Sequence, residues 1–135
     1  MSAKPFLDSN VVLYAFTESD SRSQKAKELL ANGGLNSVQV LNEFIDVAQR
    51  KLKKNWTEIH HSLAIVRVVC REPLPLTLKT HETALRIAER YKYSIYDSSI
   101  IATALEARCD TLYSEDLQDG QVIENSLTIR NPFQD

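Results

Sequence analysis

The chain has 135 residues, of which 43% are hydrophobic, with only three glycines and four prolines. This length and composition fit one compact domain over residues 1–135, large enough to fold without a disulfide or a structural metal. A formal net charge of -2 argues against a protein that binds nucleic acid through a broad basic surface.

The first predicted elements are a short strand and two helices. Residues 4–10 are typical of a strand that ends in an acidic turn, and residues 11–16 of a brief helix. Asp20 or Ser21 can cap a second helix, which the Asn-Gly-Gly sequence at 32–34 ends. The chain therefore begins with a strand followed by helices.

Two longer helices are predicted next, and they should form a protruding hairpin. A short strand at 35–36 leads to Ser37, which can cap a helix with apolar residues at helical spacing. Asn55 can cap the following helix, and Pro73 lies where that helix can no longer continue. Together the two helices make a hairpin over residues 38–70 that offers apolar surface.

The C-terminal half alternates strands and helices again. Strands are predicted at 74–78, 111–113 and 127–130, with one helix over 80–91 and another that begins at a cap formed by Asp97. This alternation predicts an α/β fold with a central, mainly parallel sheet. No internal repeat, low-complexity tract or linker divides the chain, so a single domain is expected.

Cysteine and histidine usage gives little sign of a metal site made by these residues. Cys70 and Cys109 lie far apart, and the N-terminus does not read as a signal peptide, so we expect a cytoplasmic protein with both thiols buried. His60, His61 and His81 are expected at the surface or at an interface. The longest apolar runs are shorter than the ~20 residues that cross a bilayer, so no membrane partner is expected.

Four acidic residues stand near predicted strand ends or on predicted helices: Asp8, Glu43, Asp97 and Asp116. The carboxyl ends of parallel strands form the ligand crevice of an α/β sheet, and Asp8 and Asp116 follow such ends. Each acid also has a simpler interpretation. Asp97 can be a helix cap, and Asp8 and Asp116 can be turn residues. Glu43 falls opposite the apolar stripe of its helix, which is typical of a solvated side chain.

Four segments resemble the motifs of the PIN-domain family and occur in that family's order. They are Phe-Leu-Asp-Ser-Asn at 6–10, Ser-Val-Gln-Val-Leu-Asn-Glu-Phe at 37–44, Tyr-Asp-Ser-Ser-Ile-Ile-Ala-Thr-Ala at 96–104, and Leu-Tyr-Ser-Glu-Asp-Leu at 112–117. The chain is similar in particular to VapC toxins of toxin–antitoxin pairs, including the terminal Asn131-Pro132-Phe133. The resemblance covers nearly the whole chain and implies a PIN-like three-layer α/β/α sandwich.

The resemblance also implies a metal-binding active site. Its catalytic and metal-binding acids would be Asp8, Glu43, Asp97 and Asp116, with Asn10 and Ser114 as supporting polar residues. Asp119 is a further acid near the fourth motif, and Asp116 is preferred because it follows Ser114 at the family's spacing. Oxygen ligands suit Mg²⁺ or Mn²⁺, whereas zinc calls for histidine and cysteine at ligand spacing. Two such ions can activate a water and stabilise a leaving 3′ oxygen.

The resemblance therefore implies a Mg²⁺-dependent endoribonuclease toxin that hydrolyses RNA phosphodiester bonds. It also implies a cognate VapB-like antitoxin, for which the hairpin offers apolar surface, and a homodimer. Two alternatives stay open. One is a PIN-domain nuclease of RNA processing outside toxin–antitoxin systems, and the other is a catalytically inactive PIN-like interaction module whose acids serve as caps and solubilising groups.

The densest basic patch of the sequence closes the first helix of the hairpin. It consists of Arg50, Lys51, Lys53 and Lys54. Such a patch can guide RNA phosphates, or it can be a solvated helix end whose charges suit the negative end of the helix dipole.

Overall fold

Both ends of the chain contribute to a central sheet. The computed structural model describes residues 4–18, 21–70 and 72–134. Within these ranges the strands are β1 (Phe6–Leu7), β2 (Thr111–Tyr113), β3 (Val122–Ile123) and β4 (Leu127–Arg130). The strand order is β1-β2-β4-β3, with β1, β2 and β4 parallel and β3 antiparallel to β4. The predicted α/β fold with a mainly parallel sheet is confirmed.

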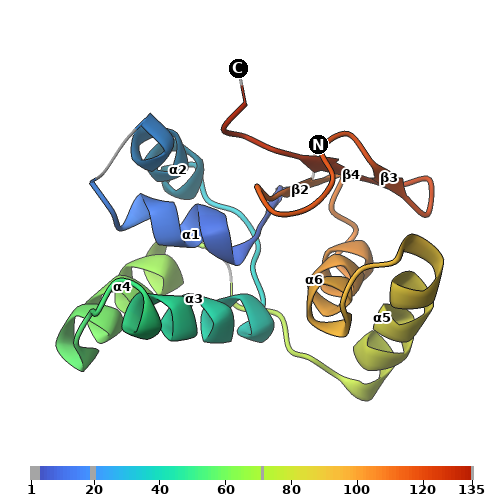
Figure 1. Ribbon diagram of the computed structural model, residues 1–135, viewed down its shortest axis with the longest axis horizontal. Helices are drawn as coiled ribbons and strands as arrows, with labels where there is room; N and C mark the ends of the chain where they lie inside the picture. Colours follow the sequence, from blue (N-terminus) through green and yellow to red (C-terminus); the bar gives the residue numbers. More distant parts are fainter. Residues whose placement is uncertain (1–3, 19–20, 71, 135) are drawn as a thin grey trace.

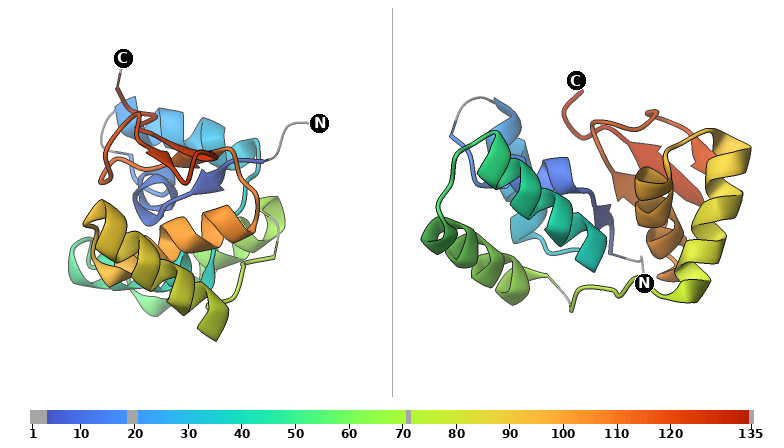
Figure 2. Two further views of the ribbon diagram at one scale, coloured as in Figure 1. Left: turned by 90° about the vertical axis from the view of Figure 1, so that its right-hand side faces the viewer. Right: turned by 60° about the horizontal axis from the view of Figure 1, so that its bottom comes forward.

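Helices flank the sheet in two groups (Figures 1 and 2). The helices are α1 (Ser9–Ala15), α2 (Ser21–Ala31), α3 (Val38–Arg50), α4 (Trp56–Val69), α5 (Leu78–Tyr91) and α6 (Ile95–Glu106). Helices α1 to α4 pack together, α5 packs on α6, and α3 also contacts α6. One hydrophobic core, which includes Phe6, Phe44, Ile100 and Leu112, joins both groups to the strands.

Side-chain caps set where several helices begin. The side chain of Ser37 accepts a hydrogen bond from Val40 N, and Asn55 forms a reciprocal capping box with Glu58, so both predicted caps are confirmed. The predicted cap at Asp97 is wrong. Ser94 caps α6 instead and accepts from Asp97 N, which puts the Asp97 carboxylate in the first turn and leaves it free for other contacts.

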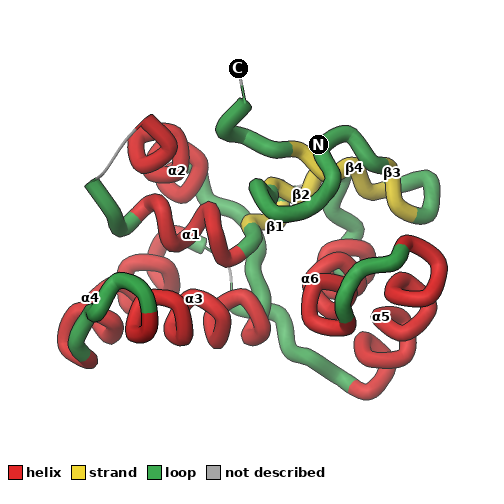
Figure 3. The backbone as a smooth tube through the Cα atoms, viewed as in Figure 1, coloured by secondary structure: helices red, strands yellow, loops and turns green. Residues whose placement is uncertain are grey.

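Two predicted strands are absent from the named strands of the sheet. Leu35 forms only an isolated bridge to Phe6, and Leu74 only an isolated bridge to Ser37. Residues 72–77, which precede α5, are loop in Figure 3. Prolines on both sides of Leu74 offer no N–H for a strand ladder, and Thr77 then caps α5 at residue 78.

The remaining helix boundaries differ by a few residues from the prediction. Helix α1 begins at Ser9 because Asp8 caps it, two residues before the predicted start. The alternative cap Asp20 lies outside the described residues. Helices α3 and α4 contact each other as the predicted hairpin. In α4, Trp56 and Val68 are largely exposed, which leaves apolar surface on the hairpin.

The predicted burial of both cysteines is confirmed, since Cys70 and Cys109 are buried free thiols. The three histidines are exposed, as expected. Across the described ranges, no helix combines the length and the hydrophobicity needed to span a bilayer.

Candidate active site

The pairing of β1 with β2 brings two polar residues together at the carboxyl ends of these strands. Leu7 pairs with Tyr113, so Asp8 and Ser114 follow at the same level, and Asp8 N donates to Tyr113 O at 3.0 Å. The Ser114 hydroxyl, fully buried, donates to Asp8 Oδ2 at 2.7 Å. Asp8 Oδ1 accepts from Ser9 N at 2.7 Å. These contacts fix the carboxylate of Asp8, which is only 3% exposed.

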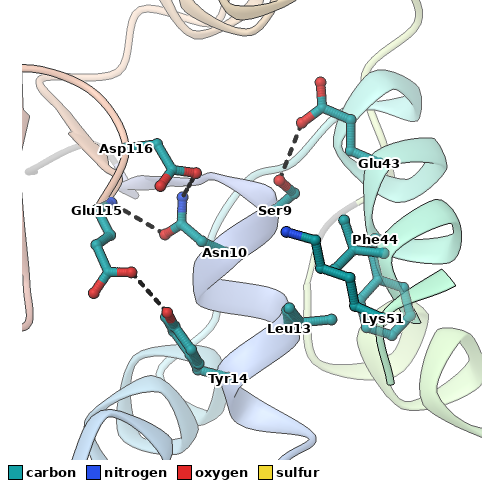
Figure 4. A pocket seen from close by; sticks show the side chains of 10 residues that line it. Ser9, Asn10, Leu13, Tyr14, Glu43, Phe44, Lys51, Glu115 and Asp116 are labelled. Carbon is teal, nitrogen blue, oxygen red and sulfur yellow. Dashed lines mark hydrogen bonds between the residues drawn. The ribbon is translucent and has the colours of Figure 1, made fainter. Parts of the chain in front are cut away.

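Asn10 ties α1 to the loop that follows β2. Its side-chain amide donates to Asp116 Oδ2 at 3.3 Å, and its carbonyl oxygen accepts from Glu115 N at 3.1 Å (Figure 4). Asp116 N in turn donates to the Ser114 hydroxyl at 3.2 Å. The loop is thereby held so that the exposed Asp116 carboxylate lies beside the buried polar centre formed by Asp8, Asn10 and Ser114.

Glu43 comes to the same region from α3. Its Oε1 accepts from the Ser9 hydroxyl at 3.0 Å, and its Oε2 accepts from Gln39 Nε2 at 3.1 Å. The face of α3 opposite its apolar stripe therefore looks onto the polar centre, and Glu43 is half-buried there. Glu43 is therefore not simply a solvated side chain, since both of its carboxylate oxygens accept hydrogen bonds from other side chains.

Asp97, in the first turn of α6, completes the group electrostatically. Burial raises the pKa of Asp97, the Asp116 charge raises it further, and the Ser94 hydrogen bond opposes the rise. Burial raises the pKa of Asp8 to about 7, against lowering by the hydrogen bonds from Ser114 and Ser9. The charges of Glu43 and Asp97 add to the rise at Asp8. The four predicted acids are therefore linked by charge repulsion, Asp8 with Glu43 and Asp97, and Asp97 with Asp116.

A cleft of about 270 Å³ lies beside two of these acids, Glu43 and Asp116, whereas Asp8 and Asp97 are not among its lining residues. It is lined by Ser9, Asn10, Leu13, Tyr14, Glu43, Phe44, Val47, Lys51, Glu115 and Asp116. On one wall, Glu115 accepts from the Tyr14 hydroxyl at 2.7 Å and pairs with Arg22 at 3.2 Å. The charge of Glu115 is thereby matched by a cation, whereas none of the four predicted acids forms an ion pair with another described residue.

The oxygen donors of this group fit a hard divalent cation such as Mg²⁺ or Mn²⁺. Over the described part of the chain, no three acidic, histidine or cysteine side chains already lie in a metal-holding arrangement. Hydrogen bonds from Ser114 and Ser9 occupy Asp8 instead. Asp116 is exposed, and its Oδ2 accepts from the Asn10 amide.

Comparison with known proteins now identifies the family. The model of the PIN domain matches residues 6–118, which contain all four acids. The chain belongs to the PIN domain family. No curated protein matches it.

Solved structures show the same PIN fold. Mycobacterium tuberculosis VapC20, described as a toxin that cleaves the sarcin–ricin loop, is 23% identical, with a TM-score of 0.69 over 83% of this chain and 89% of that one. A toxin–antitoxin complex from Klebsiella pneumoniae is 19% identical, with a TM-score of 0.70 over 98% of this chain and 99% of that one. VapBC2 from Rickettsia felis, bound to a promoter DNA fragment, is 20% identical, with a TM-score of 0.64 over 94% and 98%.

Two acids, one in the fourth PIN segment and one just after it, have contacts that the sequence does not reveal. Glu115 was not predicted from the sequence, because its partner Arg22 lies 93 residues away on α2 and no local pattern signals this pairing. Asp119 Oδ1 accepts from Asn131 N at 2.8 Å and does not line the cleft. Asp116, which lines the cleft, therefore stays the predicted fourth acid in preference to Asp119.

The Ser114 hydroxyl should stabilise both this PIN fold and the charged form of Asp8. We expect Ser114→Ala to lower the free energy of unfolding by about 1–3 kcal/mol, because the buried hydroxyl also accepts from Asp116 N. Carbon NMR of the carboxyl groups should also show a higher pKa for Asp8. Ser98→Ala is the matched control, since the buried Ser98 hydroxyl finds no partner among the described residues. Equal losses in both variants would contradict this role for Ser114.

Proposed function

We propose that this PIN domain is a divalent-metal-dependent endoribonuclease and the toxin of a VapBC-type toxin–antitoxin pair. What supports the proposal is that the charges of Glu43 and Asp97 act on the buried Asp8 and that of Asp116 acts on Asp97, while Glu43 and Asp116 line an open cleft. Carboxylates crowded in this way repel one another and the phosphates of RNA alike. A bound cation removes both repulsions, so this arrangement favours metal-dependent chemistry on a phosphodiester.

The predicted ligands are Asp8, Glu43, Asp97 and Asp116. Bound to them, Mg²⁺ or Mn²⁺ would supply a Lewis acid and a water activated for attack on phosphorus. The chain's own contribution is to hold these groups in place. Ser114 and the Ser9 N–H keep Asp8 oriented, while Asn10 restrains Asp116. Apolar side chains of Leu13 and Phe44 line the neighbouring part of the cleft and limit water there.

The toxin assignment has support from the structural neighbours. VapC20 is described as a toxin that cleaves the sarcin–ricin loop, and two other neighbours are toxin–antitoxin assemblies that match nearly the whole chain. We accordingly propose an antitoxin as partner, with the apolar surface of the α3–α4 hairpin available to it. RNA as substrate and a homodimeric state are also part of the proposal.

Incubation of the purified protein with total RNA tests the proposed chemistry. We expect cleavage with Mg²⁺ or Mn²⁺, none after EDTA, and products with 5′-phosphate and 3′-hydroxyl ends. Cleavage that persists in EDTA would contradict the metal-dependent site.

Expression in a bacterial host tests the toxin role separately. Growth should stop, and co-expression of the product of an adjacent short reading frame should restore it. Active cleavage in vitro without any effect on growth would favour a PIN-domain nuclease of RNA processing instead.

A further inference from the structure

The four residues of the basic patch at the end of α3, Arg50, Lys51, Lys53 and Lys54, have different surroundings. Arg50 pairs with Asp46 at 3.1 Å, and Lys54 lies 3.9 Å from Glu58. Lys53 is exposed and does not line the cleft beside the acids. Lys51 does line it. The four residues are therefore not an equivalent solvated cluster.

Lys51 is the lysine of the acidic cleft. No described residue forms an ion pair with it, while Arg22 and Glu115 on the opposite wall pair with each other. Figure 4 shows the Lys51 side chain extending beside Phe44, with its ammonium group directed toward α1. This group remains available to an anion that enters the cleft.

The position of Lys51 at the C-cap of α3 indicates which phosphate of an RNA strand it can reach. Glu43 and Lys51 are eight residues apart on α3 and its C-cap, which is roughly 12 Å along the helix axis. Lysine side chains tilt toward the N-terminus of their helix, so Lys51 reaches back toward the acids. The distance between Glu43 and Lys51 still suits the binding of two different phosphates of one RNA strand, one at each residue, better than the binding of a single phosphate by both.

We propose that Lys51 binds a backbone phosphate of the RNA next to the phosphodiester at the acids, and so sets how the strand lies in the cleft. This inference rests on the proposed nuclease function and deepens it. In this arrangement the RNA strand runs from the acids along α3 and passes between α1 and the C-terminal end of α3. The apolar stretch formed by Leu13, Phe44 and Val47 lies on this path and suits the faces of bases or riboses.

The test compares Lys51→Met with Lys53→Met, which removes the same charge two residues away and outside the cleft. Binding of a short labelled single-stranded RNA is measured with Mg²⁺ in an Asp97→Asn background, so that the probe stays intact. We expect Lys51→Met to weaken binding about three- to tenfold and to reduce the slope of log K against log salt by about 0.7. Lys53→Met should leave both close to the starting values.

Cleavage kinetics and a conservative variant complete the test. In the active background, Lys51→Met should raise KM with little change in kcat, because the contact exists before and during the reaction. Lys51→Arg should restore most of the binding, which a purely structural role would not predict. Equal behaviour of Lys51→Met and Lys53→Met, in a protein that does cut RNA, overturns the assignment of Lys51 alone. Absence of both RNA binding and cleavage in the unmodified chain overturns the proposed function as well.

Discussion

Replacement of Asp97 by asparagine is expected to reduce Mg²⁺-dependent RNA cleavage at least about 100-fold without loss of the fold. Even outer partners of metal ligands contribute about 10- to 100-fold to metal affinity or activity, so a direct ligand should contribute more. The fold should survive because Asp97 is half-buried and its helix is capped by Ser94. Removal of a charge that faces Asp8 and Asp116 should, if anything, raise the melting temperature without metal.

Asp119→Asn provides the matched control for this loss. It is the same chemical change, three residues from Asp116, and asparagine keeps the oxygen that accepts from Asn131 N. The control should therefore retain cleavage and stability. Circular dichroism and thermal melts of both variants separate a chemical loss from unfolding. If Asp97→Asn cuts RNA as fast as Asp119→Asn, then Asp97 is not a metal-binding acid of this protein.

The order of the motifs was sufficient to predict which residues of the candidate site lie close together, such as Asp8, Asn10 and Ser114. Asp8 and Ser114 each follow a short apolar strand, and parallel pairing of β1 with β2 brings such residues together. The location of Asn10 two residues after Asp8 puts it in the first turn of α1, where it reaches the loop after β2. Here local pattern and sheet geometry agree.

Other features depend on tertiary contacts that no local pattern encodes. Glu43 has the spacing of a solvated residue, and only the approach of α1 makes it a neighbour of Ser9. A cap at Asp97 is compatible with the local sequence, but Ser94 can also cap, and it begins the helix three residues earlier. Residues 74–78 have the hydrophobicity of a strand, yet the flanking prolines remove ladder donors. Where the local sequence allows two structures, such as a cap at Ser94 or at Asp97, tertiary packing decides which one forms.

The free energy of unfolding without metal is expected to fall as the pH rises from about 4 to about 7. Burial raises the pKa of Asp8 to about 7 in the native state, from 3.8. Between these values the unfolded chain has released this proton while the native chain still holds it, so rising pH favours unfolding. Below pH 4 both states hold the proton, and above pH 7 both have lost it. About three pKa units correspond to at most about 4 kcal/mol. Asp97 acts in the same direction.

Divalent metal should reverse this loss, because a cation binds the ionised acids of the native state and competes with the proton. Chemical denaturation at several pH values, with and without Mg²⁺, measures both effects. The stabilisation by Mg²⁺ should be larger at pH 8 than at pH 5.5, and a concentration 100 times Kd should add about 2.7 kcal/mol. Asp8→Asn removes the titrating group, so this variant should lose the decline between pH 4 and 7 that Asp8 causes, and most of the gain from Mg²⁺. If Asp8→Asn instead follows the pH profile of the unmodified chain, Asp8 is not the group whose burial opposes folding at neutral pH.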